Sequence, residues 1–357
     1  MSHPGLLQQW LSTAACQGAS DLHLVPGFRP TLRLHGNLKE LPTDELTQKV
    51  AHDLLMDLCP ESARLQLQEQ FNADFALQLD INGCPQRYRA NYFISGQQLS
   101  ACFRVISGEI PDFQWAGFPE ELAQRLAHLR NGLVLISGVT GAGKTTSLAM
   151  IVNLLNQETG HRIITIEEPI EYLFPRQANS IVTQREVGQD VRSFADGLKF
   201  GLRQDPDVML VGEIRDRETA QMALSAAETG HLVFSTLHTR DAKGAISRYV
   251  DLFPQSVQHE IRSQLSLSLR AVVSQHLLPS ILPGEKRELA LEVMFNNIPI
   301  SSAIRFGKIE SIETNIQTGR SDGMISMDEA VKRLLDEGRI SRETAERFVT
   351  DRNYLGR

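Results

Sequence analysis

The stretch that decides the fold of this chain is Gly138-Val-Thr-Gly-Ala-Gly-Lys-Thr-Thr146. It has the form G-x-x-x-x-G-K-[ST], which binds triphosphates when it joins a strand to a helix. An apolar run ending at Ile136 precedes it, and a helix-compatible segment, 147–156, follows it. Glycines let backbone N–H groups close around phosphate, and the first turn of the helix adds further donors. A chance match in a glycine-rich turn is the alternative, and the correct flanking segments make it rare.

Each residue type in this loop has a task in holding a nucleotide. Lys144 is expected to neutralise charge on the β- and γ-phosphates, and the Thr145 hydroxyl to bind Mg²⁺. The other expected nucleotide-binding residues of the loop are Gly138, Val139, Thr140, Gly141, Ala142, Gly143 and Thr146. The predicted cofactors are therefore ATP and Mg²⁺.

Outward from the loop, apolar runs alternate with helical segments. The runs lie at 133–136, 163–166, 208–211 and 232–234. Continuous β-branched runs of this length are typical of strands that helices cover on both faces, which predicts a parallel sheet. In the tail, Ser326 and Glu329 form a capping-box pattern that begins a helix, and Gly338 ends it.

The residues before about 108 follow a different pattern, which predicts a small mixed domain. An amphipathic stretch from Leu6 to Ala15 is followed by segments of alternating polarity at 31–41, 74–80 and 87–94. His35-Gly-Asn37 and Asn82-Gly83 are typical of hairpin turns, and Leu99 to Ile106 would add a strand to the same antiparallel sheet. The expected α/β organisation is a first domain at 1–108, a linker at 109–118 around Pro111, and a second domain at 119–357 that begins with a helix from Pro119 to Leu129.

Composition is that of an ordinary globular protein. The chain has 357 residues, 41% of them apolar, and a net charge of −7, which argues against a protein that coats nucleic acid. No C-x-x-C pair is present, so free thiols are expected rather than a disulfide framework or a zinc site; the cysteines are Cys16, Cys59, Cys84 and Cys102. Because no signal peptide and no apolar run of about 20 residues is found, membrane association is expected only through a partner.

Two acidic segments follow predicted strands beside the phosphate loop. Glu213 comes directly after the run that ends at Gly212, and Glu167 begins the segment Glu167-Glu-Pro-Ile-Glu171. Hydrolysis of ATP requires one carboxylate to order Mg²⁺ and another to orient or deprotonate the attacking water. A single glutamate at a strand end is usually the beginning of a solvated loop. Two of them beside a phosphate loop favour the catalytic interpretation.

The order of these motifs resembles the secretion ATPases that drive type IV pili and type II secretion, and especially the PilT-type retraction motors. Besides the phosphate loop, segment 165–171 resembles the Asp box of that family, 210–216 its Walker B box and 229–239 its His box. Gly18-Ala-Ser-Asp-Leu-His-Leu24 resembles the entry to the family's N-terminal domain. The resemblance therefore covers almost the whole chain.

The resemblance implies a PAS-like N-terminal domain, a RecA-like ATPase domain and a hexameric ring of identical subunits. By position, Glu167 would be the general base or water-orienting carboxylate, and Glu213 would hold Mg²⁺ together with Thr145. His238 would sense the γ-phosphate, with His231 as its partner in the box. Family members commonly have Asp where Glu168 stands, which lengthens the side chain beside the expected base.

Arginines complete the site in this family, and Arg89 and Arg104 occupy positions that resemble them. Both would act from the N-terminal domain or from a neighbouring subunit. The alternatives are surface cations for these arginines and, for the histidines, simple packing; the seven-residue spacing of His231 and His238 fits no common zinc pattern.

The resemblance also implies a function, which is retraction of type IV pili. The tetracysteine motif and extra N-terminal region of extension motors are absent, but the segment 299–308 departs from the retraction motif at Ser301 and Phe306. An accessory PilU-like or extension-type motor, and a nucleotide-gated structural subunit without turnover, therefore stay open. A nucleic-acid translocase is disfavoured by charge. Expected partners are identical subunits, an inner-membrane pilus platform protein and a paralogous pilus ATPase, at the cytoplasmic face of the inner membrane.

Overall fold

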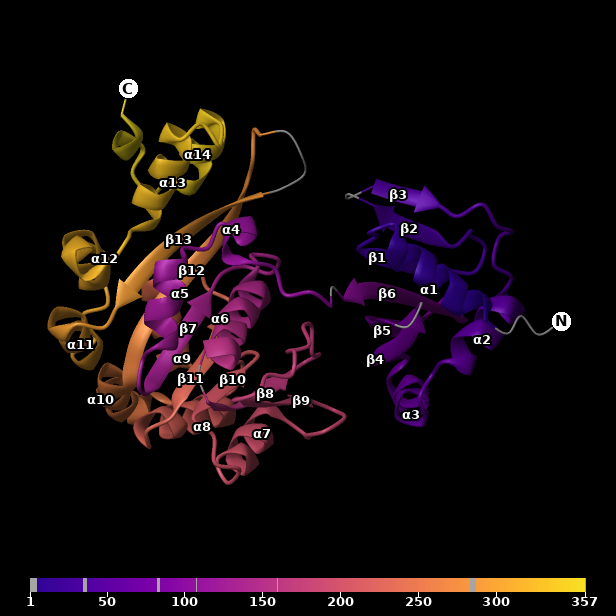
Figure 1. The fold of residues 1–357 in the computed structure, drawn as a ribbon, viewed down its shortest axis with the longest axis horizontal. Helices are drawn as coiled ribbons and strands as arrows, with labels where there is room; N and C mark the ends of the chain where they lie inside the picture. Colours follow the sequence, from indigo (N-terminus) through magenta and orange to yellow (C-terminus); the bar gives the residue numbers. More distant parts are fainter. Residues whose placement is uncertain are drawn as a thin grey trace. The chain divides into compact units, whose positions relative to one another are not determined.

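The computed structural model describes residues 5–34, 37–81, 84–106, 108–158, 160–282 and 287–356. They form two units, Met1–Glu109 and Ile110–Arg357, each built on its own sheet (Figure 1). The sheet of the first unit is antiparallel and that of the second is mostly parallel, so the predicted α/β class is confirmed. The turn residues expected at 35–36 and 82–83 lie outside the described residues.

In the first unit, the described residues form a six-stranded sheet in the order β3-β2-β1-β6-β5-β4. Its strands are β1 (Asp21–Leu24), β2 (Thr31–Leu34), β3 (Asn37–Glu40), β4 (Asn72–Ile81), β5 (Cys84–Ser95) and β6 (Gln98–Ile106), and its helices are α1 (Leu6–Cys16), α2 (Gln48–Asp57) and α3 (Glu61–Gln70). Tyr88, Ala90 and Tyr92 are buried and alternate with less buried residues along β5, as expected for a strand that is covered on one face. Their hydroxyls donate to the carbonyls of Leu11 in α1 and Leu55 in α2, at 2.9 Å each, which ties the helices to one face.

The sheet of the second unit has seven strands among the described residues, in the order β13-β12-β7-β11-β10-β8-β9. The strands are β7 (Gly132–Ser137), β8 (Arg162–Glu167), β9 (Ile181–Glu186), β10 (Val208–Val211), β11 (Leu232–Leu237), β12 (Leu269–Pro279) and β13 (Arg287–Phe295). The parallel strands expected from the four apolar runs are all present. At one edge, however, β12 and β13 form an antiparallel hairpin, which the apolar runs did not predict.

Helices cover both faces of this sheet, which explains why its central strands are buried throughout (Figure 1). They are α5 (Glu120–Ala127), α6 (Lys144–Glu158), α7 (Phe194–Gly201), α8 (Arg217–Glu228), α9 (Ala242–Asp251), α10 (Gln258–Ser268), α11 (Ile298–Arg305), α12 (Ser311–Thr318), α13 (Met327–Asp336) and α14 (Arg342–Phe348). Ser326 caps α13 as predicted, accepting from the N–H of Glu329. The expected linker contains a short helix, α4 (Phe113–Ala116), and Phe118 is buried in the core of the second unit.

The order of the parallel strands determines which loops meet. The carboxyl ends of parallel strands lie along one edge of a sheet, and neighbouring strands are about 4.8 Å apart. β11 lies between β7 and β10, and β8 lies on the far side of β10. The loops that follow these four strands, which hold the phosphate loop and the acidic segments, therefore share that edge.

Across the part of the chain that the structure describes, no helix has both the length and the apolar character needed to span a bilayer.

Candidate nucleotide site

The phosphate loop has the backbone of an anion cradle. Three of its glycines have positive φ angles, which residues with a Cβ rarely adopt. The angles are 154° at Gly138, 77° at Gly141 and 85° at Gly143. A Cβ added to Gly138 would also lie 2.6 Å from the backbone oxygen of Gln275, whereas one added to Gly141 would meet open space. The loop is therefore pressed against the sheet at its base and open at its tip.

Gln275 of β12 supports the loop from the sheet. Its side chain is fully buried, and its Nε2 donates a hydrogen bond of 2.5 Å to the carbonyl of Ala142. Next to it, Ser137 at the end of β7 donates to the hydroxyl of Ser274 at 2.7 Å. The sequence analysis did not identify Gln275. The available signal was an amide inside the apolar run Ala271–Leu278, because a buried polar side chain normally has a partner to bind.

Lys144 begins α6 and lies inside the loop. Its ammonium donates to the carbonyls of Gly138 at 2.8 Å and Val139 at 3.2 Å, and only 8% of the residue is exposed. Burial lowers the pKa of Lys144, while the carboxylates of Glu213 and Glu171 raise it. Lys144 is thus a buried cation at the N-terminus of a helix and inside a glycine cradle. These surroundings fit a phosphate group. Thr145 follows it in the first turn of α6.

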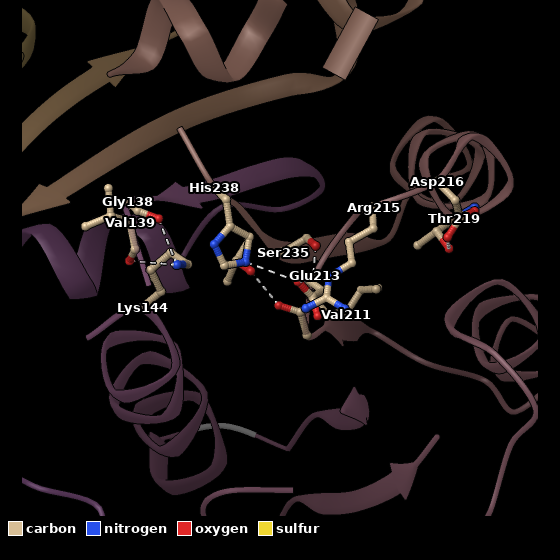
Figure 2. A network of polar contacts seen from close by, with 12 residues as sticks. Gly138, Val139, Lys144, Val211, Glu213, Arg215, Asp216, Thr219, Ser235 and His238 are labelled. Atoms are coloured by element: carbon tan, nitrogen blue, oxygen red, sulfur yellow. Dashed lines mark hydrogen bonds and ion pairs between the residues drawn. The ribbon is translucent and has the colours of Figure 1, made fainter. Parts of the chain in front are cut away.

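Glu213 lies two residues after the end of β10, and its carboxylate has Arg215 and His238 as neighbours, as Figure 2 shows. Arg215 Nε lies 2.6 Å and His238 Nε2 3.1 Å from the same carboxylate oxygen. The backbone before it is held by β11, because Ser235 donates to the carbonyl of Val211 at 2.8 Å. Glu213 and His238, each predicted from the sequence to act at the nucleotide, thus lie in contact, while Arg215 was not predicted.

Glu167 and Glu171, the first and last residues of the segment 167–171, have different surroundings. Glu167 is 7% exposed, and its Oε1 accepts from Thr165 at 2.5 Å and from Gln184 Nε2 at 3.1 Å. Glu171 is exposed, and its charge acts on Lys144. Directly after it, the hydroxyl of Tyr172 lies 2.9 Å from that of Thr146 in α6, which brings this end of the segment beside the phosphate loop. The contacts therefore favour Glu171 over Glu167 as the carboxylate nearer the phosphates.

The structure separates the two histidines that were expected to act together. His238 follows the carboxyl end of β11, whereas His231 precedes the amino end of the same strand. The ring of His231 donates from Nδ1 to the carbonyl of Ala226 at 3.0 Å, and its backbone carbonyl accepts from Gly132 at the start of β7. A six-residue strand spans about 20 Å at 3.3 Å for each residue. His231 and His238 therefore lie at opposite ends of β11, and a part for His231 in nucleotide binding stays a prediction.

Arg89 and Arg104 belong to the other unit, where they stand directly opposite each other on β5 and β6. Arg89 pairs with Asp74 at 3.5 Å and Arg104 with Asp21 at 3.0 Å. Directly opposed residues of an antiparallel pair point to the same face, so the two guanidinium groups share one face of the N-terminal sheet.

Comparisons with known proteins agree with this geometry. The family model described as "Type II/IV secretion system protein" matches residues 3–327. The chain belongs to this family. It is 40% identical to the type IV pilus retraction ATPase PilT of Pseudomonas aeruginosa, over 95% of this chain and 96% of that protein. It is also 35% identical to the type IV pilus ATPase PilU of the same organism, over 95% of this chain and 87% of PilU.

A solved structure shows that the similarity extends to the three-dimensional fold. The crystal structure of the pilus retraction motor PilT with bound ADP superposes with a TM-score of 0.87 at 39% identity, covering 99% of each chain. Similarity at this level extends to both units. Together with the family membership, it supports nucleotide binding by this chain.

Replacing Gln275 tests the support of the loop. A Gln275→Met chain keeps a side chain of similar size but leaves the buried carbonyl of Ala142 without its donor, at a cost of about 1–3 kcal/mol. We expect the affinity for ADP, measured by calorimetry, to fall by roughly tenfold or more. Gln264→Met is the matched control, because that amide donates to Glu228 at 3.3 Å in an exposed position. Equal ADP affinities for the two variants would contradict the role of Gln275.

Proposed function

We propose that this chain is an ATP-hydrolysing motor subunit that powers retraction of type IV pili. The observation that carries the proposal is Lys144, buried in a glycine cradle at the start of α6, with the pair of Glu213 and His238 on the neighbouring strands. Identity of 40% to the retraction ATPase PilT, along nearly its whole length, supports the mechanical task.

ATP and Mg²⁺ would bind at the phosphate loop. The backbone N–H groups of residues 138–146 and the ammonium of Lys144 would hold the phosphates, and the Thr145 hydroxyl and the Glu213 carboxylate would hold Mg²⁺. The metal would supply positive charge to the phosphate oxygens. Arg215 and His238, which contact Glu213, would be drawn toward the phosphates when the ion takes that carboxylate, so His238 would report the presence of a γ-phosphate.

The attacking water would be oriented by Glu171. This carboxylate is exposed, and its charge raises the pKa of Lys144. It precedes Tyr172, whose hydroxyl contacts Thr146 in the first turn of α6. Glu167 would act indirectly, since its hydrogen bonds to Thr165 and Gln184 hold the backbone that leads to Glu171.

A complete motor would be a ring of six identical subunits, made of a PAS-like domain at 1–108, a linker at 109–118 and a RecA-like domain at 119–357. Arg89 and Arg104 would supply positive charge to the transferring phosphate, as an arginine finger does. The ring would lie at the cytoplasmic face of the inner membrane, bound to a pilus platform protein and working with a paralogous pilus ATPase, without nucleic acid.

An accessory role in retraction is the second candidate. Identity to PilU is 35% along 95% of this chain, close to the value for PilT. Phe306, which departs from the retraction motif, is 69% exposed at the end of α11. An exposed aromatic side chain there would suit contact with a partner, such as a second motor ring.

Lys144→Ala tests the nucleotide site. The variant loses the cation that offsets phosphate charge, so we expect ATP turnover to fall at least about a hundredfold, since charge stabilisation is usually the largest catalytic term. Phosphate release by the purified, assembled protein is the measurement. Lys199→Ala, on the exposed part of α7, is the control for loss of a lysine. Unchanged turnover in Lys144→Ala would reject an ATPase at this loop.

Paired isosteric variants distinguish the two glutamates. Glu171→Gln should lower turnover by about 10²-fold or more while ATP affinity stays the same, because an amide cannot accept the proton of water. Glu167→Gln should lower it less, since Gln also accepts the hydrogen bonds from Thr165 and Gln184. The reverse order would return the catalytic assignment to Glu167, and wild-type turnover in both would favour a nucleotide-gated structural subunit.

Deletion of the gene tests the cellular task. Loss of a retraction motor should leave cells with more surface pili and no pilus-driven movement, both scored by microscopy. Wild-type protein should restore both, and Lys144→Ala should restore neither. Pili that disappear would indicate an extension motor instead. Hyperpiliation that returns to normal with a PilT relative alone would indicate the accessory role.

A further inference from the structure

The loop that carries His238 is short and has two fixed points. Residues 238–241 join the end of β11 to the start of α9. At the first fixed point, the Nε2 of His276 donates to the carbonyl of Arg240 at 3.0 Å. At the second, the N–H of Ala242 donates to Oε1 of Glu292 at 2.7 Å. Both of these contacts come from the β12–β13 hairpin, in addition to the contact of His238 with Glu213 after β10.

The same two hairpin residues also contact the C-terminal cluster, which we define as residues 327–348. It contains α13, α14 and the turn between them. The ring of His276 lies edge-on to Phe348 of α14, with centroids 5.8 Å apart. The backbone N–H of Met327, at the start of α13, hydrogen-bonds to Glu292. Just before α13, Ile325 pairs with Val293 through backbone bonds of 2.8 and 3.0 Å in both directions. Each residue that holds the loop therefore also holds the cluster.

The cluster rests on the outer end of the hairpin. Its apolar side chains pack on Leu278 of β12 and Ala290 of β13; they are Val331, Leu334, Ile340 and Ala345. Glu288, two residues before Ala290, forms an ion pair with Arg339 between the helices of the cluster. This contact attaches the cluster at a distance from the loop.

Glu292 is a charged group in a nearly closed environment. Burial raises its pKa to about 7, and the carboxylates of Asp241 at the cap of α9 and Glu313 in α12 act in the same direction. The N–H groups of Ala242 and Met327 oppose the shift. An ionised carboxylate accepts these bonds more strongly than a protonated one, whereas burial and the two neighbouring carboxylates favour the protonated form and so raise the pKa of Glu292.

We propose that Glu292 and His276 are positioning residues, through which the C-terminal cluster controls the loop that carries His238. The inference rests on the proposed function, because it concerns turnover at that site. A protein or subunit that moved the cluster would shift Arg240 and the start of α9, and with them the histidine that contacts Glu213. Neither residue touches the nucleotide in this scheme.

Four variants of the full chain test the proposal. Glu292→Gln replaces the carboxylate acceptor by a neutral amide, and His276→Phe keeps the ring against Phe348 but loses the bond to Arg240. We expect each to lower kcat by about five- to twentyfold, with ADP affinity within twofold of wild type. Phe348→Ala, which is remote from the loop, should lower kcat in the same direction. Glu288→Gln, which alters the contacts of this side chain with Arg339 and Ser280 away from the loop, should stay within twofold.

Hydrogen exchange gives a readout that does not require turnover. Peptides covering 238–242 should exchange faster in Glu292→Gln, His276→Phe and Phe348→Ala than in wild type, and at the wild-type rate in Glu288→Gln. Unchanged exchange in Phe348→Ala would overturn the coupling. If wild type exchanged as expected but did not hydrolyse ATP, the proposed function would fail and the coupling would stand.

The pH profile separates a role for the charge of Glu292 from simple packing. Protonation of Glu292 in the wild type removes the negative charge and leaves a neutral acceptor, as the amide of Glu292→Gln is. The kcat of wild type divided by that of Glu292→Gln should therefore fall toward one between pH 8 and pH 6. His238 is present in both proteins and cancels from the ratio. A constant ratio would overturn the assignment of Glu292.

Discussion

The second unit depends on one steric constraint: the chain has to turn sharply after β7 while lying in contact with the main chain of β12. A Cβ at Gly138 would lie 2.6 Å from the carbonyl of Gln275, so the position excludes every side chain. The positive φ angles at Gly141 and Gly143 then direct backbone N–H groups inward and bring Lys144 to the first turn of α6. The cradle, its cation and the helix N-terminus are consequences of this one turn.

Charge at the edge of the sheet follows from strand order. Because β11 lies between β7 and β10, His238 reaches Glu213, and Glu213 in turn influences the pKa of Lys144. Burial lowers the pKa of Lys144, because the charged ammonium loses contact with water. An anionic ligand would offset the free energy that this desolvation costs.

The antiparallel hairpin at the edge of the sheet connects parts that lie far apart in the sequence. Successive residues of a strand point to opposite faces. Gln275 therefore reaches the phosphate loop on one face, while His276 reaches the loop after β11 and the C-terminal cluster on the other. The buried carboxylate of Glu292 joins the first turns of α9 and α13 to the same hairpin. One pair of strands thus contacts both sides of the candidate site.

The sequence alone determined the features that depend on neighbours in the chain: the glycine turn and its lysine, the caps of the tail helices, the α/β class, and Glu213 and His238 at strand ends. It could not rank Glu167 against Glu171, place His231 at the far end of β11, or find Gln275, His276 and Glu292. Those depend on hydrogen bonds between residues up to 133 positions apart, such as Gln275 with Ala142. Tertiary structure decided them, because local preferences set turns and helix ends, whereas the order and pairing of strands set which side chains meet.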